Sequence, residues 1–188
     1  MSISIHTKFT KRRAILQSLA AGVLLSAFPL HAQNLETKKP LKIGIIGSGN
    51  VGGTVGELWV KAGHEVMFAS RNLEDDKVLA AKIGGGTKVG TPKEAAAFGD
   101  VLFFAVPYAA LPALGRDLAA EIKGKIVLDA CNPIPSRDGD MANDALAKGT
   151  GVASPLFLPG ARIVRAYTHV GYAQMKQEAH RAGERLGY

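Results

Sequence analysis

The sequence has a single cysteine, Cys131, and after its first 32 residues it contains no internal repeat and no low-complexity segment. One cysteine excludes an intramolecular disulfide and any metal site built from several cysteines. Stability must therefore come from a buried core, and about 150 residues can bury roughly 70% of their unfolded surface. Apolar residues make up 47% of the chain and charged residues 21%, which excludes collagen-like and wholly disordered proteins. A length of 188 residues allows one domain comfortably.

Acidic residues are missing from the first 32 residues, and this changes the meaning of the formal net charge of +7. Those residues contain four basic side chains. The rest of the chain, with 19 basic and 16 acidic residues, therefore carries only +3. A nearly balanced domain offers little electrostatic attraction to a polyanion. We expect no nucleic-acid partner.

A stretch without charge, residues 14–30, follows the basic residues 11–13. A basic segment, an apolar segment and a small residue, Ala32, after which cleavage can occur, follow one another in the order of a secretory signal. The paired arginines resemble the twin-arginine export motif. We predict a cleaved, twin-arginine-like signal peptide over residues 1–32, a linker over 33–40, and a periplasmic or secreted protein that meets the membrane only through its signal. An uncleaved anchor is the alternative, although about 17 residues are short for a span of about 20.

Apolar runs and helical patterns alternate over the rest of the chain. We expect strands at 41–46, 65–69, 101–106, 125–130 and 161–167, and helices at 50–62, 73–83, from Pro92 to Gly99 and around 110–122. A capping box, Thr91 to Glu94, opens the third helix. This alternation is typical of a parallel sheet with right-handed crossovers. The prediction is an α/β, Rossmann-type doubly wound parallel sheet in a single domain over residues 41–188.

A G-x-G-x-x-G motif lies between the first predicted strand and the first predicted helix, at Gly47, Ser48, Gly49, Asn50, Val51 and Gly52. In such a unit Gly47 makes a tight turn, Gly49 lets the backbone approach a pyrophosphate, and Gly52 lets the helix pack on the strand. The helix N-terminus favours the anion. An ordinary glycine turn is the alternative, but the position between strand and helix favours dinucleotide binding.

No acidic residue stands at the end of the second predicted strand, where an NAD site needs one for the ribose hydroxyls. Ser70 and Arg71 occupy that place. Arg71 can bind the extra phosphate of NADP bidentately, Ser70 can donate a hydroxyl, and Lys77 can add a second charge. The expected cofactor is NADP, with a solvated surface arginine as the alternative.

Two further strand ends belong to the same surface, because ligands of such sheets lie across the carboxyl ends of the strands. Val106 and Pro107 end one strand, and Asn132 ends the next. Asn132 is equally compatible with a hydrogen bond to the cofactor and with plain turn chemistry, and both interpretations stay open. Cys131 is expected to be a buried filler rather than a nucleophile.

Five segments cover most of residues 41–167 and carry a family resemblance: KIGIIGSGNVGGTVGELWVKAGHEV, ASRN, FFAVPY, KIVLDACNP and LPGARIVRAY. They resemble the F420-dependent NADP reductases, which share their amino-terminal domain type with pyrroline-5-carboxylate reductases. The resemblance implies direct hydride transfer between NADP and the deazaflavin F420 without a protein acid or base, so no catalytic residue and no metal ligand is expected. As cofactor contacts it implies Ser48, Gly49, Asn50, Val51, Ser70, Arg71, Val106 and Pro107, with Lys77 beside them.

Two departures from the family accompany this resemblance. Tyr167, Thr168 and His169 stand where the family usually has Phe, then Asn or His, then Thr. Family members also continue beyond the position of Tyr188, so we expect a chain cut short at its carboxyl terminus. The expected function is an NADP(H)-dependent oxidoreductase with F420 or a flavin as second partner. The alternatives are a reductase of a metal ion or another small molecule, and a dinucleotide-binding module without turnover. A homodimer stays open.

The leader generates a first prediction. Arg12→Lys combined with Arg13→Lys should block export and leave a longer precursor in the cytoplasm, because the paired arginines carry the twin-arginine signal. Immunoblots of cytoplasmic and periplasmic fractions would measure precursor and mature protein. Normal export of the double variant would contradict the twin-arginine motif while leaving a general secretory signal intact.

Overall fold

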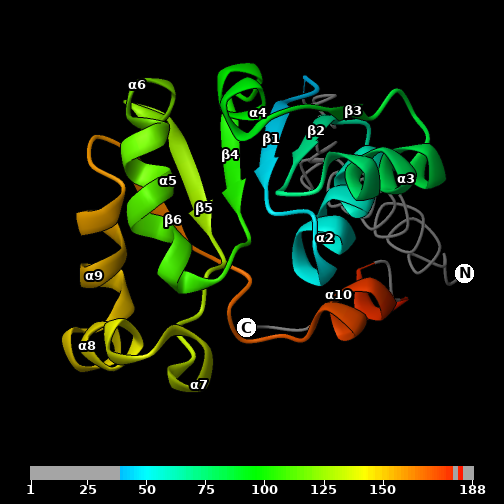
Figure 1. Cartoon of the computed structure of the whole chain (residues 1–188). Helices are drawn as coiled ribbons and strands as arrows, with labels where there is room; N and C mark the ends of the chain where they lie inside the picture. Colours follow the sequence, from blue (N-terminus) through cyan, green and yellow to red (C-terminus); the bar gives the residue numbers. More distant parts are fainter. Residues whose placement is uncertain (1–38, 180–181, 184–188) are drawn as a thin grey trace, which may run out of the picture. The chain divides into compact units, whose positions relative to one another are not determined.

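The computed structural model describes residues 39–179 and 182–183, all within one unit that begins at Lys39. The predicted signal peptide and nearly all of the predicted linker lie outside the described residues. The described residues form a six-stranded, wholly parallel sheet with the order β3-β2-β1-β4-β5-β6 (Figure 1). Its strands are β1 Lys42–Ile46, β2 Glu65–Ala69, β3 Lys88–Val89, β4 Val101–Phe104, β5 Ile126–Asp129 and β6 Arg162–Arg165. This is the Rossmann strand order, and it confirms the predicted fold class.

Helices cover both faces of this sheet (Figure 1). One face carries α2 Asn50–Lys61, α3 Leu73–Ile83 and α10 Tyr172–Glu178. The other face carries α4 Pro92–Phe98, α5 Leu111–Asp117, α6 Ala119–Ile122, α8 Asp140–Lys148 and α9 Thr150–Phe157. The short elements η1 Tyr108–Ala110 and α7 Pro135–Asp138 follow β4 and β5. No helix in the described ranges combines the length and the hydropathy that a membrane span requires.

The central strands are buried on both faces, as the apolar run at 101–106 predicts. Ile45 and Phe103 belong to the core under α2 and α3, whereas Ile46 and Phe104 belong to the core under α4 and α5. None of the four is more than 2% exposed. Neighbouring residues of a strand point to opposite faces, so one short segment supplies both cores.

Several predicted boundaries differ from the observed ones. The strand expected to reach 106 ends at Phe104, and the helix expected around 110–122 is divided into α5 and α6. The division falls at Leu118, whose φ of −110° and ψ of 13° leave the helical region while its side chain enters the core. Helices α7, α8, α9 and α10 and the two-residue β3 were not predicted. The buried face of α8 consists of the alanines 142 and 145, which give a weak periodic signal.

Helix α4 is closed at both ends by side chains. The predicted capping box is confirmed: Glu94 N–H donates to Thr91 Oγ1 at 3.2 Å, and Thr91 N–H donates to Glu94 Oε2 at 2.7 Å. At the other end, Lys125 Nζ donates to the carbonyl oxygens of Ala96 at 2.7 Å and Gly99 at 2.9 Å. These bonds satisfy main-chain groups that the helix itself leaves unpaired. They fix α4 at the crossover between the two halves of the sheet.

The capping box gives a stability prediction. Thr91→Ala should lower the free energy of unfolding by about 1 kcal/mol, because one N–H of the first turn loses its acceptor. Thr91→Ser keeps that acceptor and should stay close to the wild type. Urea unfolding with an unchanged m-value would measure the difference. Equal stability of the alanine variant would show that the box contributes nothing.

Candidate dinucleotide-binding site

The glycine loop, residues 47–52, joins the carboxyl end of β1 to the first turn of α2. Gly47 has a φ of +102°, and a Cβ there would lie 2.4 Å from the carbonyl oxygen of Ala105. A Cβ on Gly52 would lie 1.8 Å from the carbonyl oxygen of Gly47. Neither position can carry a side chain in this conformation. These are the tight turn and the close helix packing that the motif predicts.

The N-terminus of α2 is open. Gly49 is its N-cap residue, and a Cβ there would meet no atom within 4 Å. No side chain among the described residues caps this helix, and its first turn contains no acid. Helix α3 differs, because the Asn72 side chain accepts hydrogen bonds from Glu74 N–H and Asp75 N–H. The first N–H groups of α2 and the positive end of its dipole are therefore available to an anion.

The end of β2 lies directly beside this loop, because Gly47 N–H donates to Ala69 O at 2.8 Å. Ser70 Oγ accepts from Asn72 N–H at 3.1 Å, which shapes the turn into α3. The Arg71 side chain is exposed, and the structure records no hydrogen bond or ion pair for it among residues 39–179 and 182–183. This guanidinium is free to bind a phosphate.

Lys77 lies farther along α3 and is engaged. Its Nζ forms an exposed ion pair with Glu74 Oε1 at 2.7 Å. The two predicted cations therefore differ: Arg71, just before α3, has no partner among the described residues, whereas Lys77, within α3, is paired with Glu74.

The end of β4 closes the other side of the loop. Ala105 N–H donates to Ile46 O at 2.9 Å, and Val106 Cγ1 would lie 2.9 Å from a Cβ on Gly47. Pro107 follows, exposed, as the N-cap residue of η1. Strands β1 and β4 are neighbours at the point where the order of the sheet reverses, and ligands of such sheets bind there. The structure therefore brings Val106 and Pro107 to the glycine loop.

Asn132 follows β5, and both polar ends of its side chain are used. Its Nδ2 donates to Thr168 O at 2.8 Å, and its Oδ1 accepts from Arg165 Nη2 at 3.2 Å. Arg165 also pairs with the buried Asp129, with 2.6 Å between Nη1 and Oδ2. Of the two interpretations left open for Asn132, this geometry favours a structural link between β5 and β6. A contact with the cofactor stays a prediction.

The loop after Asn132 is held by a second ion pair. Arg137 Nη2 donates to Asn132 O at 2.8 Å and pairs with Asp138 Oδ2 at 2.8 Å. Hydrogen bonds from Arg137 lower the pKa of Asp138 to about 2, so this side chain stays a carboxylate at ordinary pH. It also accepts from Ala109 N–H at 3.2 Å, which ties the loop after β5 to the loop after β4.

Cys131 is 1% exposed, and burial raises the pKa of its thiol. A neutral, buried thiol is not a nucleophile, which agrees with the predicted role of a core filler. The described residues hold no cluster of three or more His, Cys, Asp or Glu side chains that could bind a metal ion.

The sequence analysis did not identify Asp76, and it did not predict the conformation of Tyr167. The buried carboxylate of Asp76 accepts a hydrogen bond from the Ser48 hydroxyl. Asp76 lies three and four residues before the apolar Leu79 and Ala80, so all three fall on one face of the helix. This spacing could have predicted that Asp76 is buried. Tyr167 follows β6 with a φ of +59°, and its ring packs edge-on against the rings of Phe103 at 5.4 Å and Trp59 at 6.0 Å. Nothing in the sequence predicts that conformation.

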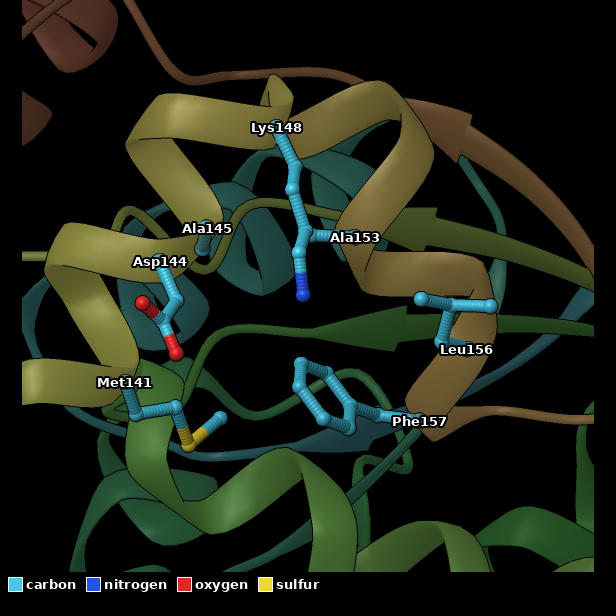
Figure 2. Close-up of a pocket in the computed structure, with 7 residues that line it drawn as sticks. All are labelled: Met141, Asp144, Ala145, Lys148, Ala153, Leu156 and Phe157. Atoms are coloured by element: carbon cyan, nitrogen blue, oxygen red, sulfur yellow. The ribbon is translucent and has the colours of Figure 1, made fainter.

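A pocket of about 380 Å³ lies elsewhere, between α8 and α9 (Figure 2). Its walls are mostly apolar, with one acid and one base from α8, and it is lined by Met141, Asp144, Ala145, Lys148, Ala153, Leu156 and Phe157. None of the predicted site residues lines it.

Residues 42–133 match the family described as NADP oxidoreductase, coenzyme F420-dependent. Over that segment, a little under half of the chain, the sequence is similar to this family. The match confirms the resemblance predicted from the sequence and indicates an NAD(P)-dependent oxidoreductase. The matched segment contains every predicted cofactor contact, from Gly47 to Asn132. Among curated proteins none matches the chain.

Solved structures share the fold. A hypothetical protein from Sinorhizobium meliloti is 22% identical, with a TM-score of 0.57 over 76% of this chain and 68% of its own. The 3-hydroxyisobutyrate dehydrogenase of Mycobacterium tuberculosis, solved with L-serine, is 21% identical, with a TM-score of 0.54 over 74% of this chain and 44% of its own. The chain thus spans about two thirds of the first protein and less than half of the second.

The glycine loop gives a binding prediction. Gly49→Val should abolish dinucleotide binding and leave the fold largely intact, because the new side chain enters open space that a pyrophosphate would need. Gly52→Ala is the contrasting variant. Its Cβ collides with the Gly47 carbonyl and should destabilise the protein itself. Fluorescence titration with NADPH and thermal melting would separate the two effects. Unchanged NADPH affinity in a folded Gly49→Val protein would mean that the loop is only a turn.

Proposed function

We propose that this protein binds NADP(H) along the carboxyl ends of β2, β1 and β4 and transfers hydride between NADP(H) and a second redox partner, F420 or a flavin. One observation carries the choice of NADP. The end of β2 has no carboxylate, and the exposed Arg71 stands there next to the open N-terminus of α2. A carboxylate would repel the 2′-phosphate, whereas a free guanidinium attracts it.

The residues present fit such a cofactor. Main-chain N–H groups of Ser48, Gly49, Asn50 and Val51 are the donors for the pyrophosphate, and no acid of the first turn of α2 opposes it. Arg71 is the charged donor for the 2′-phosphate. The Ser70 hydroxyl, which donates to Asn72 O at 3.2 Å, would have to exchange that acceptor for the phosphate. Val106 and Pro107 border the site at the end of β4. When bound, NADPH supplies the hydride. The protein's part is binding, orientation and exclusion of water, with no side chain required to move a proton.

Lys77 can join these contacts by exchanging its partner. An exposed ion pair such as Lys77 with Glu74 contributes about 0.2–1 kcal/mol. A charge-assisted hydrogen bond to a phosphate contributes about 1.5–3 kcal/mol. The phosphate is the stronger partner wherever it lies within reach of Nζ, so the observed ion pair does not exclude Lys77 from the site.

The acceptor is tested by NADPH oxidation with F420, free flavins and ferric chelates, beside a binding titration of the same sample. Oxidation that depends on F420 or a flavin supports the proposal. Oxidation with ferric chelates alone would assign a metal-ion reductase. Tight binding without oxidation by any acceptor would indicate a dinucleotide-binding module.

We also propose that the protein is exported folded, with its cofactor loaded in the cytoplasm. The twin-arginine-like leader supports this proposal.

Cofactor choice gives the next prediction. Arg71→Ala should weaken NADPH binding roughly ten- to a hundredfold and NADH binding far less, because one charge-assisted contact to the 2′-phosphate is lost. Ser70→Asp should lower or invert the preference, since its carboxylate repels the phosphate and offers acceptors to the ribose of NADH. Paired titrations with NADPH and NADH at fixed salt would measure both. Equal losses for the two nucleotides would show that Arg71 is only a surface charge.

A further inference from the structure

One side chain of the first turn of α3 is fully buried. Residues 73–75 are exposed, whereas Asp76 is 0% exposed. Its Oδ1 accepts a hydrogen bond from the Ser48 hydroxyl. Its Oδ2 has no hydrogen-bond partner in the part of the chain that the structure describes.

Helix stability does not account for this aspartate. Acids in a first turn complement the helix dipole, but Glu74 and Asp75 already supply that charge from exposed positions. A carboxylate that is buried with one oxygen unpaired is costly, and an apolar side chain at this position would avoid the cost. Among the described residues, the bond to Ser48 is the one hydrogen bond that the Asp76 side chain makes.

That bond joins two separate parts of the candidate site. Ser48 lies inside the glycine loop, between the two glycines that shape it. Asp76 lies in the first turn of α3, which begins at Leu73, two residues after Arg71. One turn farther along, Leu79 lies beside α2, 3.4 Å from the position of a Cβ on Gly53 (α2 and α3 are adjacent in Figure 1). The Ser48–Asp76 bond is therefore the buried anchor of the end of α3 that lies nearest Arg71.

We propose that Asp76 is a positioning residue that fixes Arg71 relative to the glycine loop and so sets the preference for a nucleotide with a 2′-phosphate. The inference rests on the proposed function and adds a specificity determinant to it. The Ser48 hydroxyl gives its only proton to Asp76. Ser48 therefore serves the pyrophosphate through its main-chain N–H and not through its side chain.

The test compares NADPH and NADH titrations of the wild type, Asp76→Ala and Asp76→Asn. Asp76→Ala should weaken NADPH binding about tenfold and NADH binding less than about twofold. NADPH loses affinity because its 2′-phosphate depends on the position of Arg71. NADH is affected less because it has no such phosphate, and because the released Ser48 hydroxyl becomes a donor for the pyrophosphate of either nucleotide. Asp76→Asn is the matched control. Its amide oxygen can accept the same hydrogen bond without the charge, so its NADPH to NADH ratio should stay within about twofold of the wild type.

Two results would overturn the inference: equal losses of NADPH and NADH binding in Asp76→Ala, as a merely structural role predicts, or an Asp76→Asn protein that behaves like Asp76→Ala. Should Asp76→Ala fail to fold, Ser48→Ala combined with Asp76→Ala removes both partners at once, which is nearly neutral for stability. That double variant must then show the same loss of preference, and a retained preference contradicts the inference.

Failure of the inference differs from failure of the proposed function. A wild type without preference for NADPH, or an Arg71→Ala protein that keeps it, would refute the assignment of the site to NADP. A preference that is lost in Arg71→Ala and kept in Asp76→Ala would refute only the role of Asp76.

Discussion

The close approach of α2 to β1 is the constraint on which the rest of the site depends. The helix can lie there only because Gly52 lacks a side chain, since a Cβ would come within 1.8 Å of the Gly47 carbonyl oxygen. One turn later Gly56 repeats the condition against the ring of Phe68, 2.4 Å from a Cβ. This packing sets the N-terminus of α2 above the carboxyl end of β1, beside the ends of β2 and β4. A helix held one side-chain layer farther away would carry its free N–H groups away from Arg71.

The two halves of the sheet end differently. At the ends of β5 and β6, charged groups satisfy one another: Asp129 Oδ1 accepts from Cys131 N–H at 2.9 Å, while its other oxygen pairs with Arg165. A buried ion pair offsets its desolvation only when further hydrogen bonds complete it, and here they do. At the ends of β1 and β2, the first N–H groups of α2 and the guanidinium of Arg71 have no side-chain partner among the described residues. In the first half the polar groups satisfy one another, whereas the second half leaves donors that the proposed nucleotide would use.

Features that are local in sequence could be predicted, and features that depend on distant partners could not. The glycine loop and the box at Thr91 are complete within six and four residues, so composition and spacing specify them. Asn132 was ambiguous because its partners, Arg165 and Thr168, lie 33 and 36 residues away. Asp76 was missed for the same reason, its donor being 28 residues distant. A side chain's chemistry can be read from the sequence, but whether that chemistry is already satisfied depends on the fold.

At the proposed 2′-phosphate site, the position of the charged groups matters more than their total charge. Residues 71–77 contain three acids and two bases, so this segment is net negative. Its summed field does not attract a phosphate over a distance comparable with the Debye length of about 8–10 Å. Attraction arises only at hydrogen-bond range, where the planar donors of Arg71 can outweigh the acids behind them. The proposed preference for NADPH over NADH would therefore depend on where Arg71 lies. The position of Arg71 depends in turn on the contacts between the first turn of α3 and the glycine loop.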